Sequence, residues 1–125
     1  MAKRIFTSFA IEDKTIKNLF LGQAKNDDVP YEFVDMAVKE PWSDTWKTRC
    51  RTKIKGCHGV IVLITKNLKK ADGARWEIKC AKEEGIPVLG VYMKSCTILD
   101  SPSELDGIKK ITWTWSGIAE FVNGL

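Results

Sequence analysis

The chain has 125 residues, of which 44% are hydrophobic, so we expect a single domain over residues 1–125 with one core and no second domain. The net charge of +4 is modest, no run approaches the roughly 20 apolar residues of a membrane span, and the start lacks a signal-peptide pattern, so we expect a soluble, cytoplasmic protein. Four cysteines without a C-x-x-C pair and a single histidine give no zinc or disulfide spacing, so neither a metal nor a disulfide is expected.

The first third of the chain alternates between strand and helix patterns. Residues 4–9 alternate and are rich in β-formers, which predicts a first strand. A helix is predicted from Glu12 to about residues 25–28, followed by a turn at Val29-Pro30, because apolar residues recur there at helical spacing: Ile16, Leu19, Phe20 and Ala24. Residues 31–36 predict a second strand, and residues 37–43 form a loop with a proline and an aromatic residue.

A basic cluster follows this loop: Lys47, Arg49, Arg51, Lys53 and Lys55. The apolar residues among them are spaced by four, four and three positions, which predicts a helix: Trp46, Cys50, Ile54 and Cys57. Asp44 is the expected N-cap and Gly56 the expected terminator. The cluster is either a nucleic-acid patch or a solvated helix face, and the solvated face is favoured because the basic residues point in different directions without interleaved aromatics.

The second half repeats the strand and helix alternation. Residues 59–65 are almost continuously aliphatic, which is typical of a central parallel strand buried on both faces, and residues 86–92 repeat the signal. Between them we expect a helix with Asp72 as its N-cap and Gly85 as its left-handed terminator. Residues 94–107 predict a loop with room for one helical turn, residues 109–113 an edge strand, and residues 116–125 a closing helix.

The alternation predicts an α/β fold in three layers, a five-stranded parallel sheet that is doubly wound in the flavodoxin-like or TIR-like manner. Ligands of such sheets bind outside the carboxyl ends of the strands, so the loops at residues 9–13, 36–44 and 65–72 are of most interest. A phosphoacceptor receiver is excluded because Ser8-Phe9-Ala10 and Ile64-Thr65-Lys66 lack its carboxylates. A flavodoxin-like phosphate loop is excluded because residues 10–13 lack the Ser, Thr and Gly residues it needs.

Glu77 is the most unusual residue of the third predicted helix. It lies at the edge of the apolar arc formed by Ala74, Ile78 and Ala81, near the helix N-terminus. The positions three and four away from it carry no basic residue, so it has no ion-pair partner within the helix. We expect a half-exposed carboxylate, which is either a helix acid without a task or a functional group.

Four segments favour the functional alternative: Ile5-Phe-Thr-Ser-Phe9 with Asp13, Tyr31-Glu-Phe-Val-Asp35, residues 59–65, and Arg75-Trp-Glu-Ile78 running on to residue 91. Their order and spacing resemble the TIR-like family, in particular its compact branch from Thoeris anti-phage systems. The resemblance implies that Glu77 is the catalytic glutamate and that Phe9 lines the entrance of the same cleft. The other candidate substrate-binding residues come from the surrounding loops: Ala10, Asp13, Asp35, Trp42, Trp46 and Thr65.

The chain departs from the family pattern at Gly73. TIR proteins usually carry a tryptophan four residues before the glutamate, whereas here Trp76 directly precedes Glu77 and points away from the sheet-facing arc. Either Trp42 or Trp46 closes the pocket instead, or catalysis is weak.

The resemblance implies cleavage of the nicotinamide–ribose bond of NAD, with NAD as the substrate and no metal or further cofactor. Attack by water gives ADP-ribose and attack within the molecule gives a cyclic product, and both remain open. Related proteins often complete their pocket by head-to-tail assembly, which implies self-association or a TIR-like partner. The competing hypothesis is a non-catalytic TIR-like adaptor whose exposed tryptophans dock a protein: Trp76, Trp113 and Trp115.

Overall fold

The computed structural model describes residues 3–26, 31–36 and 38–125. Five strands form one parallel sheet, namely β1 (Lys3–Ser8), β2 (Tyr31–Val34), β3 (Gly59–Ile64), β4 (Val88–Tyr92) and β5 (Lys110–Thr112). Four α-helices connect or follow them: α1 (Lys14–Asn26), α2 (Asp44–Lys55), α3 (Asp72–Glu83) and α4 (Trp115–Asn123). The predicted connection at residues 94–107 contains two 3-10 turns, Ile98–Asp100 and Ser103–Leu105.

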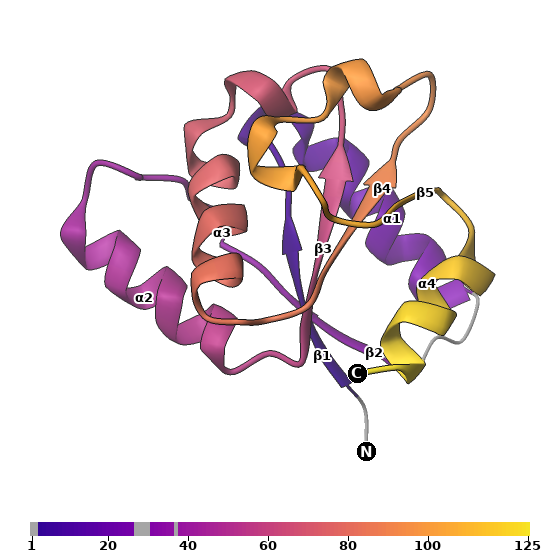
Figure 1. The fold of residues 1–125 in the computed structure, drawn as a ribbon, viewed down its shortest axis with the longest axis horizontal. Coiled ribbons are helices and arrows are strands. Elements are labelled where there is room, and N and C mark those ends of the chain that lie inside the picture. The colour runs from indigo at the N-terminus through magenta and orange to yellow at the C-terminus, as the bar shows by residue number, and fades with distance from the viewer. Residues whose placement is uncertain (1–2, 27–30, 37) are drawn as a thin grey trace.

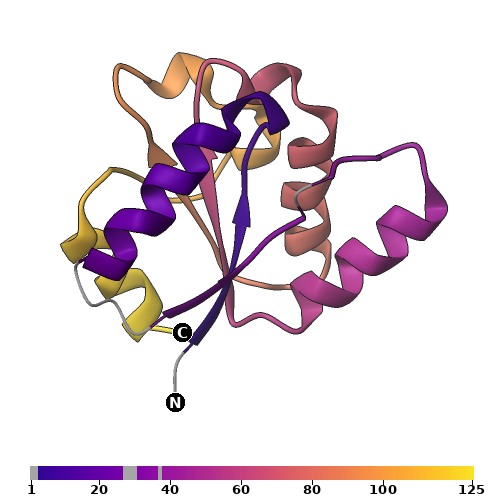
Figure 2. The ribbon, with the colours of Figure 1, turned by 180° about the vertical axis from the view of Figure 1, so that it is seen from behind.

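The strand order β2-β1-β3-β4-β5 is that of a flavodoxin-like doubly wound sheet, which confirms the predicted fold class. Helices α2 and α3 cover one face and α1 and α4 the other (Figures 1 and 2). All six residues of β3 are buried, as its aliphatic sequence predicted, because both of its faces are covered. The short β5 lies at the edge, as expected.

The two faces of the sheet carry separate apolar clusters. Phe6, Val60 and Val62 pack with residues of α2 and α3, among them Cys50 and Ile78. Their neighbours along the strands point to the opposite face and pack with residues of α1 and α4: Ile5, Ile61, Leu63, Phe20 and Ile118. This alternation places Ser8 on the α3 side of β1, where it faces Glu77.

Two predicted helix caps are wrong by one residue. The N-cap of α2 is Ser43, whose hydroxyl accepts a 3.2 Å hydrogen bond from the Trp46 amide, so Asp44 lies in the first turn. The N-cap of α3 is Ala71, and Asp72 is already helical. An aspartate is favourable in the first turn as well as at the cap, because both positions lie at the positive end of the helix dipole. Gly85 has a φ of 69°, which confirms the left-handed end of α3.

The apolar face of α1 differs from the prediction. Phe20 and Ala24 are buried, but Leu19 is 60% exposed. Lys17 is buried instead, because its ammonium pairs with Asp35 Oδ2 at 3.1 Å. The predicted turn at Val29-Pro30 lies outside the described residues.

The tryptophans proposed as an exposed docking surface are half-buried. The ring centres of Trp113 and of Trp115, the first residue of α4, lie 5.6 and 5.0 Å from that of Phe20 on α1. Trp76 packs edge-on against Trp46, with ring centres 5.4 Å apart. Their rings therefore contribute to the core more than to a free surface.

Two residues of the basic cluster, which was predicted to be a solvated helix face, contact neighbouring segments. Arg51 forms ion pairs with Glu83 and Glu84 at the end of α3, and Lys53 donates a 2.9 Å hydrogen bond to the Asp35 carbonyl. These contacts tie α2 to its neighbours.

Among the helices that the structure describes, none combines the length and the apolar character that a bilayer crossing requires.

Candidate active site

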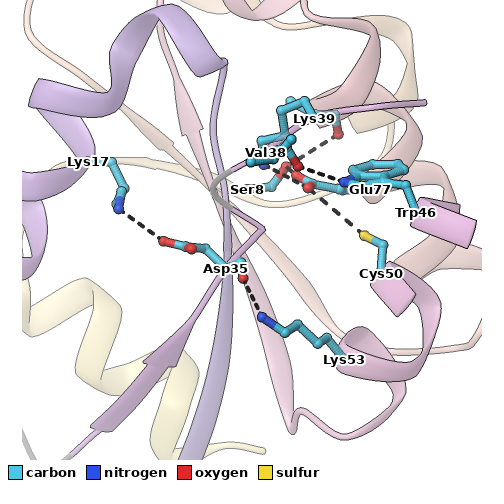
Figure 3. A network of polar contacts seen from close by, with 10 residues as sticks. Ser8, Lys17, Asp35, Val38, Lys39, Trp46, Cys50, Lys53 and Glu77 are labelled. Carbon is cyan, nitrogen blue, oxygen red and sulfur yellow. Dashed lines mark hydrogen bonds and ion pairs between the residues drawn. The ribbon is translucent and has the colours of Figure 1, made fainter. Parts of the chain in front are cut away.

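Three segments that are far apart in the sequence meet Glu77 at the carboxyl end of β1 (Figure 3). Ser8 ends β1, Lys39 comes from the segment between β2 and α2, and Cys50 lies on α2. Ser8 Oγ donates a 2.8 Å hydrogen bond to Glu77 Oε1, and Lys39 Nζ lies 2.7 Å from Oε2. Cys50 Sγ lies 4.0 Å from the same oxygen. The carboxylate is therefore contacted from three sides.

Glu77 is fully buried, so the expectation of a half-exposed carboxylate is wrong. The helical wheel placed it correctly at the edge of the apolar arc and without a partner inside the helix. A helical wheel of α3 alone does not show that α2 and the residues before it pack against this edge of α3 and bury Glu77 (Figure 1). A buried carboxylate needs a charged partner and hydrogen bonds, and here both come from other segments.

Burial raises the pKa of Glu77 to about 7, although the charge and hydrogen bond of Lys39 and the Ser8 hydroxyl each lower it. The negative charge of Asp35 adds to the rise. Burial, followed by the charge of Glu77, also raises the pKa of the Cys50 thiol, which stays protonated. The site therefore contains one carboxyl group that titrates near neutral pH beside a neutral thiol.

The Ser8 hydroxyl can serve both protonation states of Glu77. Its oxygen lies 2.8 Å from Glu77 Oε1 and 3.3 Å from the carbonyl oxygen of Ala74. When Glu77 is ionised, the hydroxyl donates to the carboxylate. When Glu77 is protonated, the hydroxyl accepts from the carboxyl group and donates to Ala74. Neither state leaves this buried hydroxyl unpaired.

Lys39 is the main residue that sequence reasoning missed. Its side chain is 6% exposed, and its ammonium lies 4.3 Å from the centre of the Phe9 ring as well as against Glu77. A single lysine in a polar loop carries no sequence signal, and 38 residues separate it from Glu77. The glycine at position 73 was the available clue, since a Cβ there would lie 2.7 Å from Lys39 Cβ.

Of the predicted substrate-binding residues, Phe9 contacts this ion pair directly. Phe9 is fully buried with its ring beneath Lys39, and Ala10 beside it is also fully buried. Asp35 does not contact Glu77. Its carboxylate pairs with Lys17, and its carbonyl oxygen accepts a hydrogen bond from Lys53 (Figure 3). Asp35 therefore acts on Glu77 through its charge, without touching it.

The two tryptophans offered as replacements for the missing one differ in position. Trp42 is 77% exposed and lines a cavity of about 200 Å³ together with Lys39 and Gly73. Trp46 is 5% exposed, and its indole N–H donates a 2.6 Å hydrogen bond to the Val38 carbonyl. Only Trp42 of this pair borders the cavity beside Gly73, whereas Trp46 supports the segment that carries Lys39.

Asp13 and Thr65 form a separate polar group on the other side of the sheet edge. The Asp13 carboxylate accepts hydrogen bonds from the Thr65 hydroxyl and, at 2.9 Å, from the Asn67 amide. These residues line a cavity of about 520 Å³ whose walls are mainly apolar, with Leu19 and Trp113 among them. The lining of that cavity does not include Glu77, so the structure does not bring Asp13 and Thr65 together with it.

The described part of the chain contains no group of three or more His, Cys, Asp or Glu side chains that could hold a metal ion. All four cysteines are free thiols, and three of them are buried: Cys50, Cys57 and Cys80. The groups that lie against the Glu77 carboxyl group are the ammonium of Lys39, the hydroxyl of Ser8 and the thiol of Cys50.

Comparisons with known proteins place this site in context. The TIR-like domain of the Thoeris protein ThsB matches residues 6–97, about three quarters of the chain, including Phe9, Lys39 and Glu77. A 3-dehydroquinate dehydratase-like protein from Bifidobacterium longum is similar in structure, with a TM-score of 0.44 and 13% identity over 99% of this chain and 94% of that one. No curated protein matches the sequence. The chain belongs to the TIR-like domain family of the Thoeris protein ThsB, a family of anti-phage defence.

Proposed function

We propose that the protein cleaves the bond between nicotinamide and ribose in NAD, with Glu77 as the catalytic carboxylate. The observation that supports this most is the burial of Glu77 at the carboxyl end of the sheet, with a pKa near 7 and a cation already against it. Membership of the ThsB TIR-like family supports the same function. Strongly perturbed carboxyl groups at strand ends are typical of catalytic sites.

The bond that breaks joins C1′ of the ribose to the ring nitrogen of nicotinamide. Its electron pair stays on that nitrogen, which changes from a cationic pyridinium to a neutral ring. The positive charge moves to the ribose in a transition state that resembles an oxocarbenium ion. The ionised Glu77 carboxylate stabilises this charge, and its effect is large because the surroundings exclude water.

Ser8 has a positioning role in this scheme. Its hydrogen bond holds Oε1, which leaves Oε2 as the oxygen that faces the substrate. Oε2 is now occupied by Lys39 Nζ, at 2.7 Å. A fixed carboxylate needs no reorganisation when the ribose becomes positive, which is the main advantage of a preorganised site.

The product depends on what attacks C1′. Attack by water gives ADP-ribose and releases one proton, whereas attack by an atom of the same molecule gives a cyclic product. A site that excludes water favours the cyclic product. A second copy of the chain, or another TIR-like chain, completes the pocket in this proposal, because the cavity at Gly73 holds only about 200 Å³. Pockets for drug-sized ligands have about 300–1,000 Å³.

The same small cavity favours the second candidate function, a non-catalytic TIR-like adaptor. In that case the Lys39–Glu77 ion pair is a permanent part of the core and NAD never reaches the carboxylate. The two candidates make opposite predictions for a single measurement, the release of free nicotinamide.

The deciding experiment incubates the purified protein with NAD, over a range of protein concentrations that promotes self-association, and measures nicotinamide by chromatography. Glu77→Gln keeps the size and hydrogen bonding of the side chain but removes the charge, so the rate should fall about a hundredfold or more. Absence of nicotinamide at every concentration and with a TIR-like partner added rejects the enzyme and leaves the adaptor. Full activity of Glu77→Gln rejects Glu77 as the catalytic carboxylate.

A further inference from the structure

The Lys39 side chain fits the space beside Glu77 along its whole length. Its aliphatic stem passes over Gly73, where an added Cβ would lie 2.7, 3.2 and 3.3 Å from Lys39 Cβ, Cγ and Cδ. Any side chain at position 73 would therefore displace the lysine. The absence of a side chain at Gly73 is what allows Lys39 to reach the carboxylate.

The ammonium of Lys39 lies between two groups that both attract cations. Glu77 Oε2 is 2.7 Å from Nζ, and the centre of the Phe9 ring is 4.3 Å from it. An ionised carboxylate and the face of an aromatic ring are the pair of groups that binds flat, delocalised cations well. Phe9 is fully buried and part of the core, so the ring stays in place if the lysine leaves.

Lys39 contacts Glu77 and also lines a cavity at the surface. It lines the cavity of about 200 Å³ at the start of α3, whereas the buried Glu77 does not. The segment that carries it is exposed on both sides of the lysine, since Val38 is 61% and Trp42 77% exposed. Exposed segments with few packed apolar side chains open at low cost, so movement of Lys39 does not require unfolding of the core.

We propose that Lys39 is a built-in competitor that occupies the subsite for the positively charged ring of the substrate, and that it must withdraw before Glu77 can act. The inference rests on the proposed function, because it assigns to the subsite the pyridinium group of an NAD-like nucleotide. Phe9 and Glu77 recognise the positive ring, and the cleavage step removes that charge. The neutral product then binds the subsite less well than Lys39 does, which favours product release.

Charges on every neighbouring element bear on this competition. Lys39 comes from the segment before α2, Cys50 from α2 and Ser8 from β1, while Asp35 acts from the end of β2 and is neutralised in part by Lys17. The other groups remain when Lys39 withdraws. A cation that replaces it therefore meets one carboxylate, one neutral thiol and one hydroxyl.

The test uses 1-methylnicotinamide, which is methylated on the ring nitrogen and is therefore a pyridinium cation without a scissile ribose bond, and nicotinamide as its neutral counterpart. In Lys39→Met the unbranched stem over Gly73 is kept and the charge is lost. Loss of Lys39 removes a charge and a hydrogen bond that lower the pKa of Glu77, so binding is measured by NMR titration at several pH values up to about pH 9. Where the carboxylate is ionised, binding should become about tenfold tighter or more for the cation and stay unchanged for nicotinamide. The gain should disappear in Lys39→Met combined with Glu77→Gln. Lys79→Met, which changes an exposed lysine of α3, should behave as the wild type does.

Equal affinity of the wild type and a folded Lys39→Met for the cation overturns the proposal, as does the absence of cation binding in both. A measurement on the wild type covers the case in which Lys39→Met does not fold. Acetylation of lysines by acetic anhydride, read by mass spectrometry, should modify Lys39 slowly relative to Lys79. Saturating 1-methylnicotinamide should raise the relative rate at Lys39 severalfold, and continued protection rejects the proposal.

These outcomes are separable from those of the proposed function. If the cation binds more tightly to Lys39→Met but neither the wild type nor the variant releases nicotinamide from NAD, the cation subsite is supported and the proposed NAD cleavage is rejected. If the wild type cleaves NAD at the same rate as Lys39→Met and binds the cation equally well, the enzyme stands and the competition by Lys39 fails.

Discussion

Ser8 and Glu77 are 69 residues apart in the chain and are joined by a hydrogen bond of 2.8 Å from Oγ to Oε1. The bond connects the end of β1 to the second turn of α3, so it fixes the carboxylate relative to the sheet edge. Since the hydroxyl favours the ionised carboxylate, it also lowers the pKa of Glu77 against the effect of burial.

Ser8→Ala should therefore raise the pKa of Glu77 further and reduce NAD cleavage about tenfold, because a hydrogen bond to a charged group contributes about 1.5–3 kcal/mol. A pH–rate profile should show the acidic limb displaced to higher pH. The matched control is Thr7→Val in the same strand, since the buried Thr7 hydroxyl has no hydrogen-bond partner among the described residues. An unchanged profile for Ser8→Ala would contradict the role of the hydroxyl.

The raised pKa of Glu77 predicts a specific pH dependence of stability. The folded protein holds the proton with a pKa of about 7 and the unfolded chain with a pKa near 4.5. Between these values the folded state binds more protons, so the free energy of unfolding should fall as pH rises from 4.5 to 7 and then level off. The fall attributable to Glu77 is about 3 kcal/mol at most.

Urea denaturation at several pH values measures this effect. Glu77→Gln lacks the titrating group, so the free energy of unfolding of the wild type should fall steadily relative to that of the variant across that window. Glu84→Gln is the control, because Glu84 also has an ion-pair partner, Arg51, but is partly exposed. Its curve should run parallel to that of the wild type, with an offset of about 1 kcal/mol or less. Parallel curves for Glu77→Gln as well would show that its pKa is not raised.

Asp13 and Thr65 should contribute to stability and not to the Glu77 site. Thr65→Val leaves the buried Asp13 carboxylate with one hydrogen bond fewer, which should reduce the free energy of unfolding by about 1–3 kcal/mol. KM for NAD should stay unchanged, because both residues line the other cavity. A clear rise in KM without loss of stability would restore them as substrate-binding residues.

The cysteines should differ in reactivity in the folded protein. Cys96 is partly exposed, whereas Cys50 is fully buried beside Glu77 with a raised pKa. Iodoacetamide should therefore modify Cys96 first and leave Cys50 intact until the protein unfolds, as read by mass spectrometry.

Addition of a chelator should leave the melting temperature unchanged, and a clear drop would reveal a bound metal.

The parts of the fold that the sequence predicts well are those with a local signal. The aliphatic run of β3 and the apolar arc of α3 each follow from the period of their own residues, and both are found as expected. Leu19 shows where this fails, because a periodic pattern does not reveal that Lys17 gains Asp35 as a partner and is buried in its place. The spacing of apolar residues carries no information about ion pairs with other segments, so it cannot show that Lys17 is buried and Leu19 exposed.

The candidate site could be predicted only in part for the same reason. Glu77 was found by its isolation within its helix and by the family resemblance, both of which are written in the sequence. The Lys39–Glu77 pair depends on how the segment before α2 crosses the start of α3, which is a property of tertiary packing. Gly73 carried the relevant information, yet a glycine indicates only that something lies close and not what it is.

The hydrogen bond from the Trp46 indole to the Val38 carbonyl gives the protein an optical reporter. Val38 adjoins Lys39, so withdrawal of the lysine would break or lengthen this bond and change the polarity around the indole. The emission maximum of Trp46, isolated as the difference between the wild type and Trp46→Phe, would then shift. The movement of one lysine could thus be followed in real time by stopped-flow fluorescence, without a label.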